Sequence, residues 1–305
     1  MSPRWRQLKD SDFVYYFSRD PVAYISFTIL LILVVSAFAA PIIAPHDPYD
    51  QTTIDIMDSE LPPAWKAEGT TKFLLGTDDM GRDMFSTMLY GMRISIIIGI
   101  GAVLLQAFIG IIIGLLSGYI KRFDTILMRI ADVQLSFSTY MIAIFIGATF
   151  QMVFGVANYE RIAAPLLILI IGLAEWPQYA RTVRASVLAE RKKEYVEAAR
   201  VIGLSKTRIM WRHILPNTLS PVLVISTVQV ANAIMSEAAL SFLGLGMPQS
   251  KPSLGSLITA GFEYIFSGTW WITIFPGILL VVLILVINLL GDWIRDYLNP
   301  KLYKG

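Results

Sequence analysis

Six long apolar stretches run through the sequence, and they constrain its fold more than any other feature. They cover residues 22–44, 94–117, 130–150, 162–176, 219–240 and 272–290. Each reaches or approaches the roughly 20 residues that a helix needs to cross a bilayer. Only 16% of the 305 residues are charged, against roughly 25% in soluble domains. The sequence therefore predicts an all-α integral membrane protein whose domain at residues 22–291 contains six transmembrane helices.

Lys and Arg residues are distributed unevenly among the segments that flank these stretches. Nineteen of the 25 lie in the two terminal tails, in the connection between the second and third stretches, and in that between the fourth and fifth. Cytoplasmic loops of membrane proteins carry such an excess. We therefore expect cytoplasmic tails at residues 1–21 and 292–305, with both termini on the same side of the membrane.

The segment at residues 45–92 is the longest connection on the opposite, external side. It contains nine acidic residues between Asp47 and Asp83, together with Pro62 and Pro63. This composition predicts an extended, partly irregular external loop. A solvated loop is the simpler interpretation, and contact with a partner protein remains open.

The connection at residues 181–216 is several times longer than the 2 to 8 residues usual between bundled helices. Its pattern predicts two short helices. The first has an apolar face of mostly small side chains at helical spacing, made of Tyr195, Ala198, Ala199 and Ile202. Gly203 follows, and we expect it to end this helix in a left-handed conformation.

The second short helix is predicted to begin after Ser205 as its N-cap and to stop at Pro216. Its apolar patch consists of Ile209, Met210, His213 and Ile214. Two such helices cannot bury their own apolar faces. They must lie against the rest of the chain, the lipid surface or a cytosolic partner, and the pattern leaves lipid contact and protein docking equally open.

Motifs for catalysis and for nucleotide binding are absent from the sequence. The segment from Gly203 to Thr207 only superficially resembles a phosphate-binding loop, because Lys206 lacks the preceding glycine. The chain has no cysteine and only two histidines, so neither a catalytic triad nor a metal site is expected. We expect no intrinsic catalysis, no cofactor and no nucleic-acid partner.

Three carboxylates fall inside or beside the apolar stretches, where charge is costly to insert. Asp132 and Glu175 lie near predicted inner ends, and the simpler interpretation pairs them with Arg129 or Arg181 or exposes them at the boundary. Glu237 lies near a predicted outer end, just before a Gly-rich turn. Glu237 and Asp132 are therefore the candidates for a gate or pathway.

The second stretch contains small residues that allow helices to approach closely. These are Gly99, Gly101, Gly110, Gly114 and Gly118. Their spacing predicts tight packing against another helix.

The connection at residues 181–216 resembles the EAA loop of permease subunits of binding-protein-dependent ABC importers. The matching residues are Glu197, Ala198, Ala199, Gly203, Leu215 and Pro216. The family usually has an apolar residue where this chain has His213. In the family this loop forms coupling helices that lie in a cleft of the ATPase subunit, so the resemblance implies an ATPase-coupling role for these residues.

A second resemblance extends over nearly the whole chain. Residues 76–83, 90–95, 236–246 and 288–296, and then Pro300 to Leu302, are similar to segments of the C-type membrane subunit of dipeptide, oligopeptide and nickel permeases. The family commonly has proline where this chain has Ser138, which bears on the bend of the third helix.

Together these resemblances imply a non-catalytic permease subunit of an ATP-driven importer in the bacterial inner membrane, forming half of a translocation path for peptides. They imply a second permease subunit of the B type, two cytosolic ATP-binding subunits that bind ATP and Mg²⁺, an external substrate-binding protein and contact with membrane lipid. The rival interpretations are a secondary transporter or channel acting alone, and a purely structural membrane subunit. The exact cargo is left open.

Overall fold

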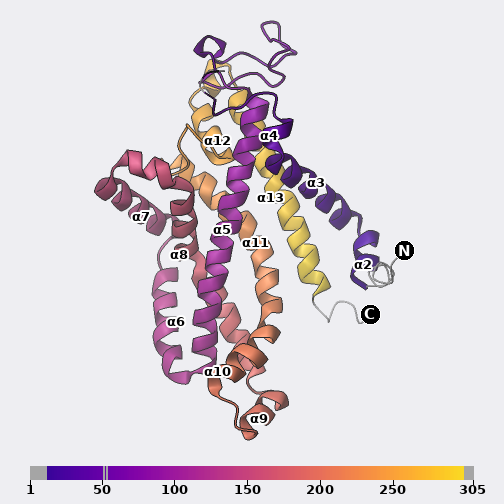
Figure 1. Ribbon diagram of the computed structural model, residues 1–305, viewed down its shortest axis with the longest axis vertical. Helices are drawn as coiled ribbons and strands as arrows, with labels where there is room; N and C mark the ends of the chain where they lie inside the picture. Colours follow the sequence, from indigo (N-terminus) through magenta and orange to yellow (C-terminus); the bar gives the residue numbers. More distant parts are fainter. Residues whose placement is uncertain (1–11, 51, 53, 299–305) are drawn as a thin grey trace. The chain divides into compact units, whose positions relative to one another are not determined.

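All regular secondary structure in the described part of the chain is helical (Figure 1). The computed structural model describes residues 12–50, 52 and 54–298. Within these ranges the extended backbone is limited to one β-bridge between Thr77 and Asp83. The predicted all-α fold is thus confirmed. The chain divides into unit 1, which includes Met1–Ile96 and Met247–Gly305, and unit 2, which is Ile97–Gly246.

Unit 1 contains the N-terminal and C-terminal helices. They are α2 (Asp12–Arg19), α3 (Pro21–Phe38), α4 (Ala40–Ile43), the 3-10 turn η1 (Ile56–Asp58), the first part of α5 (Met84–Tyr119), α12 (Leu254–Phe262), the 3-10 turn η3 (Ile265–Ser267) and α13 (Trp271–Tyr297). Asp20 caps α3, because its side chain accepts hydrogen bonds from the backbone N–H groups of Val22 and Ala23. Helix α13 packs on both α3 and α12.

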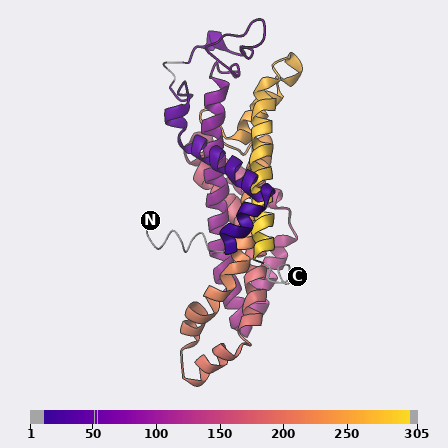
Figure 2. The same cartoon turned by 90° about the vertical axis from the view of Figure 1, so that its right-hand side faces the viewer.

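Unit 2 contains the rest of α5 and the helices that follow it. They are α6 (Lys121–Leu135), α7 (Thr139–Phe154), α8 (Val156–Glu190), α9 (Glu194–Val201), α10 (Lys206–Ile209), the π-turn η2 (Met210–Ile214) and α11 (Leu215–Phe242). Helix α8 packs against α6, α7 and α11. Within unit 2, α9 and α10 lie at one end, in both Figure 1 and the turned view of Figure 2.

Five described helices are long and apolar enough to cross a membrane. They are Pro21–Phe38, Met84–Tyr119, Asn158–Glu190, Lys206–Phe242 and Trp271–Tyr297. A sixth candidate is the pair formed by α6 and α7, which passes the same test only when the two helices are taken together. The six predicted spans therefore correspond to five helices and one broken pair.

The third predicted span, residues 130–150, is wrong as a continuous helix. Helices α6 and α7 meet at a bend of 86°. The backbone N–H of Ser136 is bonded within the last turn of α6, and the Ser136 hydroxyl donates to the carbonyl of Asp132. Ser138 is extended, with φ −63° and ψ 134°. Serine side chains that bond locally compete with helix propagation, and here they coincide with the end of α6.

The fourth predicted span, residues 162–176, is too short. Helix α8 continues to Glu190 and contains both Pro165 and Pro177. Ile162 has non-helical angles, φ −120° and ψ 20°. This kink lies one turn before Pro165, where the proline ring and its missing N–H disrupt the hydrogen-bond ladder.

The glycines of α5 confirm the predicted close packing. A Cβ at Gly114 would lie 2.6 Å from Cβ of Val183, and one at Gly118 would lie 2.7 Å from Cβ of Val187. At Gly110 a Cβ would overlap Cβ of Tyr179 and approach the backbone of α8 at Ala180 to 3.0 Å. The backbones of α5 and α8 therefore approach each other over two turns, as small-residue spacing allows.

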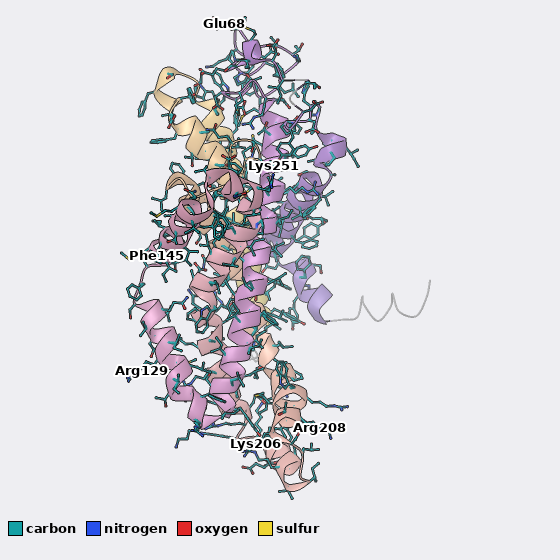
Figure 3. The ribbon with its side chains drawn as sticks, turned by 60° about the vertical axis from the view of Figure 1, so that its left-hand side comes forward. Glu68, Arg129, Phe145, Lys206, Arg208 and Lys251 are labelled. Carbon is teal, nitrogen blue, oxygen red and sulfur yellow. The ribbon has the colours of Figure 1, made fainter. Side chains whose placement is uncertain are left out.

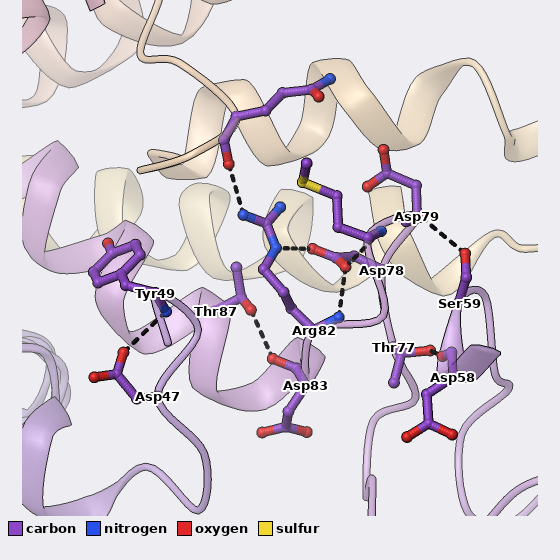
Figure 4. A network of polar contacts seen from close by, with 12 residues as sticks. Asp47, Tyr49, Asp58, Ser59, Thr77, Asp78, Asp79, Arg82, Asp83 and Thr87 are labelled. Atoms are coloured by element: carbon purple, nitrogen blue, oxygen red, sulfur yellow. Dashed lines mark hydrogen bonds and ion pairs between the residues drawn. The ribbon is translucent and has the colours of Figure 1, made fainter. Parts of the chain in front are cut away.

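The loop between α4 and α5 is ordered by a buried ion pair (Figure 4). Nε of Arg82 lies 2.6 Å from the carboxylate of Asp78, and both side chains are almost fully buried. Arg82 also donates to the carbonyl of Gln249 at 2.6 Å, while the N–H groups of Met80 and Arg82 donate to Asp78. Burial and the neighbouring charge of Asp78 raise the pKa of Asp79. The predicted irregular external loop is thus irregular but extensively hydrogen-bonded.

A second set of bonds joins η1 and Ser59 to residues 77–79, which precede α5 (Figure 4). The hydroxyl of Thr77 donates to the carbonyl of Asp58 at 2.5 Å, and that of Ser59 donates to the carbonyl of Asp79 at 2.8 Å. The indole N–H of Trp271 donates to the carbonyl of Thr77 at 3.1 Å. The loop is therefore tied to α13 as well.

The α5 to α8 contact can be tested with Gly110→Ala. The new methyl group meets backbone atoms that cannot move aside, and overpacking of this kind costs about 1 to 3 kcal/mol in the free energy of unfolding. We expect a lower thermal denaturation midpoint for the detergent-solubilised chain. Gly277→Ala in α13 is the matched control, because its Cβ meets nothing within 4 Å. Equal midpoints for the two variants would contradict the packing.

The buried ion pair can be tested with Arg82→Gln. Removing the guanidinium leaves the Asp78 carboxylate buried without its cation, which costs about 3 to 5 kcal/mol in stability. We expect trypsin to cleave after Lys66, in the same loop, much faster in this variant than in the parent. Lys72→Gln is the control, since its pair with Asp58 is partly exposed and such pairs contribute about 0 to 1 kcal/mol. A cleavage rate at Lys66 that does not change in Arg82→Gln would refute the stabilising role.

Candidate functional site

The segment that joins α8 to α11 is built around a short helix with a well-defined end. Helix α9 closes with Gly203 at φ +79°, where the N–H of Gly203 donates to the carbonyl of Arg200 and the N–H of Leu204 donates to that of Ala199. These two bonds form a Schellman motif. Ser205 then caps α10 by accepting from the N–H of Arg208 at 3.4 Å. The predicted roles of Gly203 and Ser205 in the backbone are confirmed.

Pro216 does not stop the second short helix, contrary to the prediction. Residues from Lys206 to Phe242 form one continuous helical span. The π-turn η2 directly precedes Pro216, and the N–H of Leu215 donates to the carbonyl of Met210. A π-turn widens the helix locally, so the ring avoids the carbonyl that it would meet in a regular α-helix. Leu215 and Pro216 therefore begin α11.

The buried face of α9 differs from the predicted one. Val196 and Ala199 are buried, whereas Ala198 is exposed and Val201 and Ile202 are 87% and 73% exposed. The helix is thus rotated relative to the predicted face, because Val196 provides more apolar surface to bury than Ala198 does. Sequence analysis missed Val196, although it lies three residues before Ala199, at helical spacing.

The outward side of α9 combines charge with apolar surface. Glu197 is exposed, and within the described part of the chain its carboxylate forms no ion pair. We call Glu197, Ala198, Val201 and Ile202 the α9 outer face. It exposes two large aliphatic side chains on a well-ordered backbone, an arrangement typical of an interaction surface rather than of a free loop.

Several polar contacts attach this segment to the rest of unit 2. The phenol of Tyr195 donates to the carboxylate of Glu190 at 2.6 Å and accepts from the side-chain amide of Asn217 at 3.1 Å. Arg191 donates to the carbonyl of Gly118 at 2.9 Å. Burial, followed by the hydrogen bond to Glu190, raises the pKa of Tyr195.

The second apolar patch is largely buried, so of the contacts that the sequence left open it uses the one with the rest of the chain. Ile209, Met210 and Ile214 are buried, while His213 is half-buried and its Nδ1 has no hydrogen-bond partner. Lys206 and Arg208 are exposed and project from the same end of unit 2 (Figure 3). The basic side chains thus lie at the same end of unit 2 as α9 (Figure 1).

The predicted gate or pathway residues lie away from this segment and do not come together. Asp132 on α6 forms an ion pair with Arg181 on α8 at 2.5 Å, and both side chains are more than half exposed. Glu237 on α11 is fully buried and accepts a hydrogen bond from Ser241 at 2.9 Å. The pairing of Asp132 with Arg181 matches the simpler interpretation of its sequence position.

Glu175 does not follow the simpler interpretation of its sequence position, because it is buried and its carboxylate lies in a polar cluster of unit 2 that was not predicted. The side-chain amides of Gln106 on α5 and Gln229 on α11 each lie 3.4 Å from the carboxylate of Glu175 on α8. Asn232 donates to the amide oxygen of Gln229 at 2.7 Å. Attention to charged residues alone hid the cluster, since glutamines within apolar stretches signal the same kind of polar contact.

Comparison with known proteins shows the class to which this fold and this segment belong. Residues 110–304 match the family described as the inner membrane component of binding-protein-dependent transport systems. Residues 11–63 match the N-terminal transmembrane domain of oligopeptide transport permease C. The chain belongs to this family of binding-protein-dependent transport permeases.

Individual relatives cover nearly the whole chain. The dipeptide transport system permease protein DppC of Haemophilus influenzae is 37% identical over 95% of this chain and 94% of its own length. A putative peptide transport system permease protein of Brucella suis is 41% identical over 91% of this chain and 87% of its own length. A solved structure of the MetNI methionine ABC transporter in an inward-facing conformation contains a chain that is 19% identical, with a TM-score of 0.56. The match covers 72% of this chain and 100% of that one, which supports the fold.

The backbone requirement at Gly203 can be tested by substitution. A Cβ there meets nothing within 4 Å, so any cost comes from the left-handed conformation alone, about 1 to 2 kcal/mol for an ordinary L-residue. We expect Gly203→Ala to increase amide hydrogen exchange over residues 194–209. Gly203→Asn should increase it less, because asparagine tolerates this conformation better. The reverse order would show that the end of α9 does not depend on the Gly203 conformation.

Proposed function

We propose that this chain is one of two membrane subunits of an importer that moves peptides inward, driven by separate ATPase subunits. The α9 outer face carries the proposal, because two exposed aliphatic side chains, Val201 and Ile202, lie beside the exposed carboxylate of Glu197 within the segment that resembles the EAA loop. The cytosolic ATPase would receive this face, and its closure on ATP and Mg²⁺ would rock the membrane helices between inward and outward openings. The chain itself would catalyse nothing.

The coupling residues divide into two groups on this proposal. Glu197 and Ala198 would contact the ATPase directly, together with Val201 and Ile202. Ala199 would instead hold α9 against unit 2, since its side chain is buried. Gly203 would set the end of α9, and Leu215 with Pro216 would begin the helix that receives the movement.

Orientation and cargo follow from charge distribution and from the relatives. The excess of Lys and Arg supports our inference that the α9 segment and both termini face the cytoplasm of a bacterium, with the chain in the inner membrane. Relatives named as dipeptide and peptide permeases make small peptides the leading cargo. We infer a B-type sister permease, two ATPase subunits and an external binding protein as partners, with lipid around the remaining helices.

The two candidate pathway residues, Glu237 and Asp132, differ in exposure. Glu237 is enclosed within unit 2, so we propose that it shapes the outer end of α11 rather than contacting cargo. Asp132 is exposed at its ion pair with Arg181, and it would contribute to the pathway through that pair.

Replacement of one exposed side chain tests the docking face. Ile202→Asp places a charge on the α9 outer face without disturbing a buried contact. We expect the ATPase retained by the affinity-tagged chain, co-expressed with its sister permease and ATPase subunits, to fall at least about thirtyfold, as loss of an interface hot spot of about 2 kcal/mol implies. Quantitative immunoblotting of the purified complex measures the retention.

Met57→Asp is the matched control for this experiment. Met57 is 88% exposed and lies in η1 of unit 1, on the predicted external side. The Met57→Asp variant should leave ATPase retention unchanged. Normal retention in Ile202→Asp, or equal losses in both variants, would refute the assignment of the α9 outer face as the ATPase contact.

A further inference from the structure

Helix α9 is joined to two long helices through a single phenol group. We call Glu190, Tyr195 and Asn217 the Tyr195 junction. Glu190 is the last residue of α8, Tyr195 lies in the first turn of α9, and Asn217 lies in the first turn of α11. Every bond in the junction lies within unit 2.

In the Tyr195 junction each donor hydrogen of Tyr195 and Asn217 meets an acceptor. The one phenolic hydrogen of Tyr195 goes to Oε2 of Glu190 at 2.6 Å, and the phenolic oxygen accepts from Nδ2 of Asn217 at 3.1 Å. The second hydrogen on Nδ2 goes to the carbonyl of His213 at 2.9 Å, within the π-turn. Lys193 neutralises the other carboxylate oxygen of Glu190 at 2.6 Å.

These bonds have consequences for movement. The connections from Glu190 to Glu194 and from Val201 to Lys206 hold the two ends of α9, and the buried Val196 and Ala199 hold its inner face. The Tyr195 junction adds a cross-link from the side of α9 to both neighbouring helices. A hydrogen bond to a carboxylate is among the stronger ones, so a rotation of α9 would have to break it.

We propose that Tyr195 is a positioning residue that makes α9 move together with the ends of α8 and α11, so that displacement of the α9 outer face reaches two membrane helices at once. This inference rests on the proposed function and deepens it. Tyr195 does not contact the ATPase in this scheme. It acts through α9, and a change at Tyr195 uncouples ATP hydrolysis from transport without abolishing assembly.

Tyr195→Phe tests the proposal because it removes both hydrogen bonds and keeps the ring. In vesicles holding the whole transporter, we expect the number of peptide molecules imported per ATP hydrolysed to fall at least about tenfold, as loss of a hydrogen bond to a charged group implies. ATPase retention should equal that of the parent. Asn217→Ala should lower this import ratio in the same way. Glu190→Gln should keep most of it, because the amide oxygen of the glutamine still accepts the hydrogen bond from Tyr195.

Tyr140→Phe is the matched control, because no hydrogen bond of the Tyr140 hydroxyl is present in the described part of the chain. It should leave the ratio unchanged. A second readout examines the chain directly: since the chain has no cysteine, Val201→Cys accepts a single nitroxide label at a site that is 87% exposed. We expect the electron paramagnetic resonance spectrum to show a more mobile label in Tyr195→Phe.

The two readouts separate the ways in which the proposal can fail. An unchanged label spectrum in Tyr195→Phe refutes the mechanical link. A more mobile label with an unchanged import ratio shows that the junction only fastens α9, which also overturns the proposal. If the parent chain retains no ATPase, the proposed function fails and the coupling inference fails with it, while the label still reports whether the junction holds α9.

Discussion

The close contact between α5 and α8 is the constraint on which the rest of unit 2 depends. Three glycines, Gly110, Gly114 and Gly118, let the two helices approach so closely that an added Cβ at each would overlap atoms of α8. In lipid the association of helices relies on packing and hydrogen bonds rather than on hydrophobic burial, so such contacts provide much of the specificity. The contact also brings the end of α5 to Arg191, which binds the Gly118 carbonyl. The position of the α9 segment is therefore set where α5 ends.

Local chemistry explains which features could be predicted from the sequence. Runs of apolar residues identify membrane helices because in lipid the backbone N–H and C=O groups must bond to each other, which a helix allows. Gly203 and Ser205 were predictable for a similar reason: Gly203 adopts the left-handed conformation that ends α9, and Ser205 accepts a hydrogen bond from a free N–H at the start of α10. The all-α fold and the ends of α9 and α10 follow from such rules, which need no knowledge of distant residues.

Features that depend on neighbours were less predictable. The rotation of α9 depends on which side meets unit 2, and Val196 and Ala198 both fit an amphipathic pattern. A proline usually ends a helix, but the π-turn at residues 210–214 accommodates the ring of Pro216. The 86° bend between α6 and α7 occurs at Ser136 and Ser138, without the glycine or proline that usually marks a break. For α9, packing against unit 2 decides between two locally reasonable faces, whereas Pro216 and the α6 to α7 bend depend on which of two local hydrogen-bonding patterns the backbone adopts.

The shortness of α9 has a consequence for the strength of assembly. An eight-residue helix is about 12 Å long, so its outer face is much smaller than the roughly 800 Å² per partner of a typical stable interface. One such contact binds weakly and dissociates fast. A transporter with a comparable helix in each of two membrane subunits would hold its ATPase dimer by avidity, because binding at the first helix raises the effective concentration at the second. Weak single contacts joined in this way can shift and reform during each cycle while the complex stays assembled.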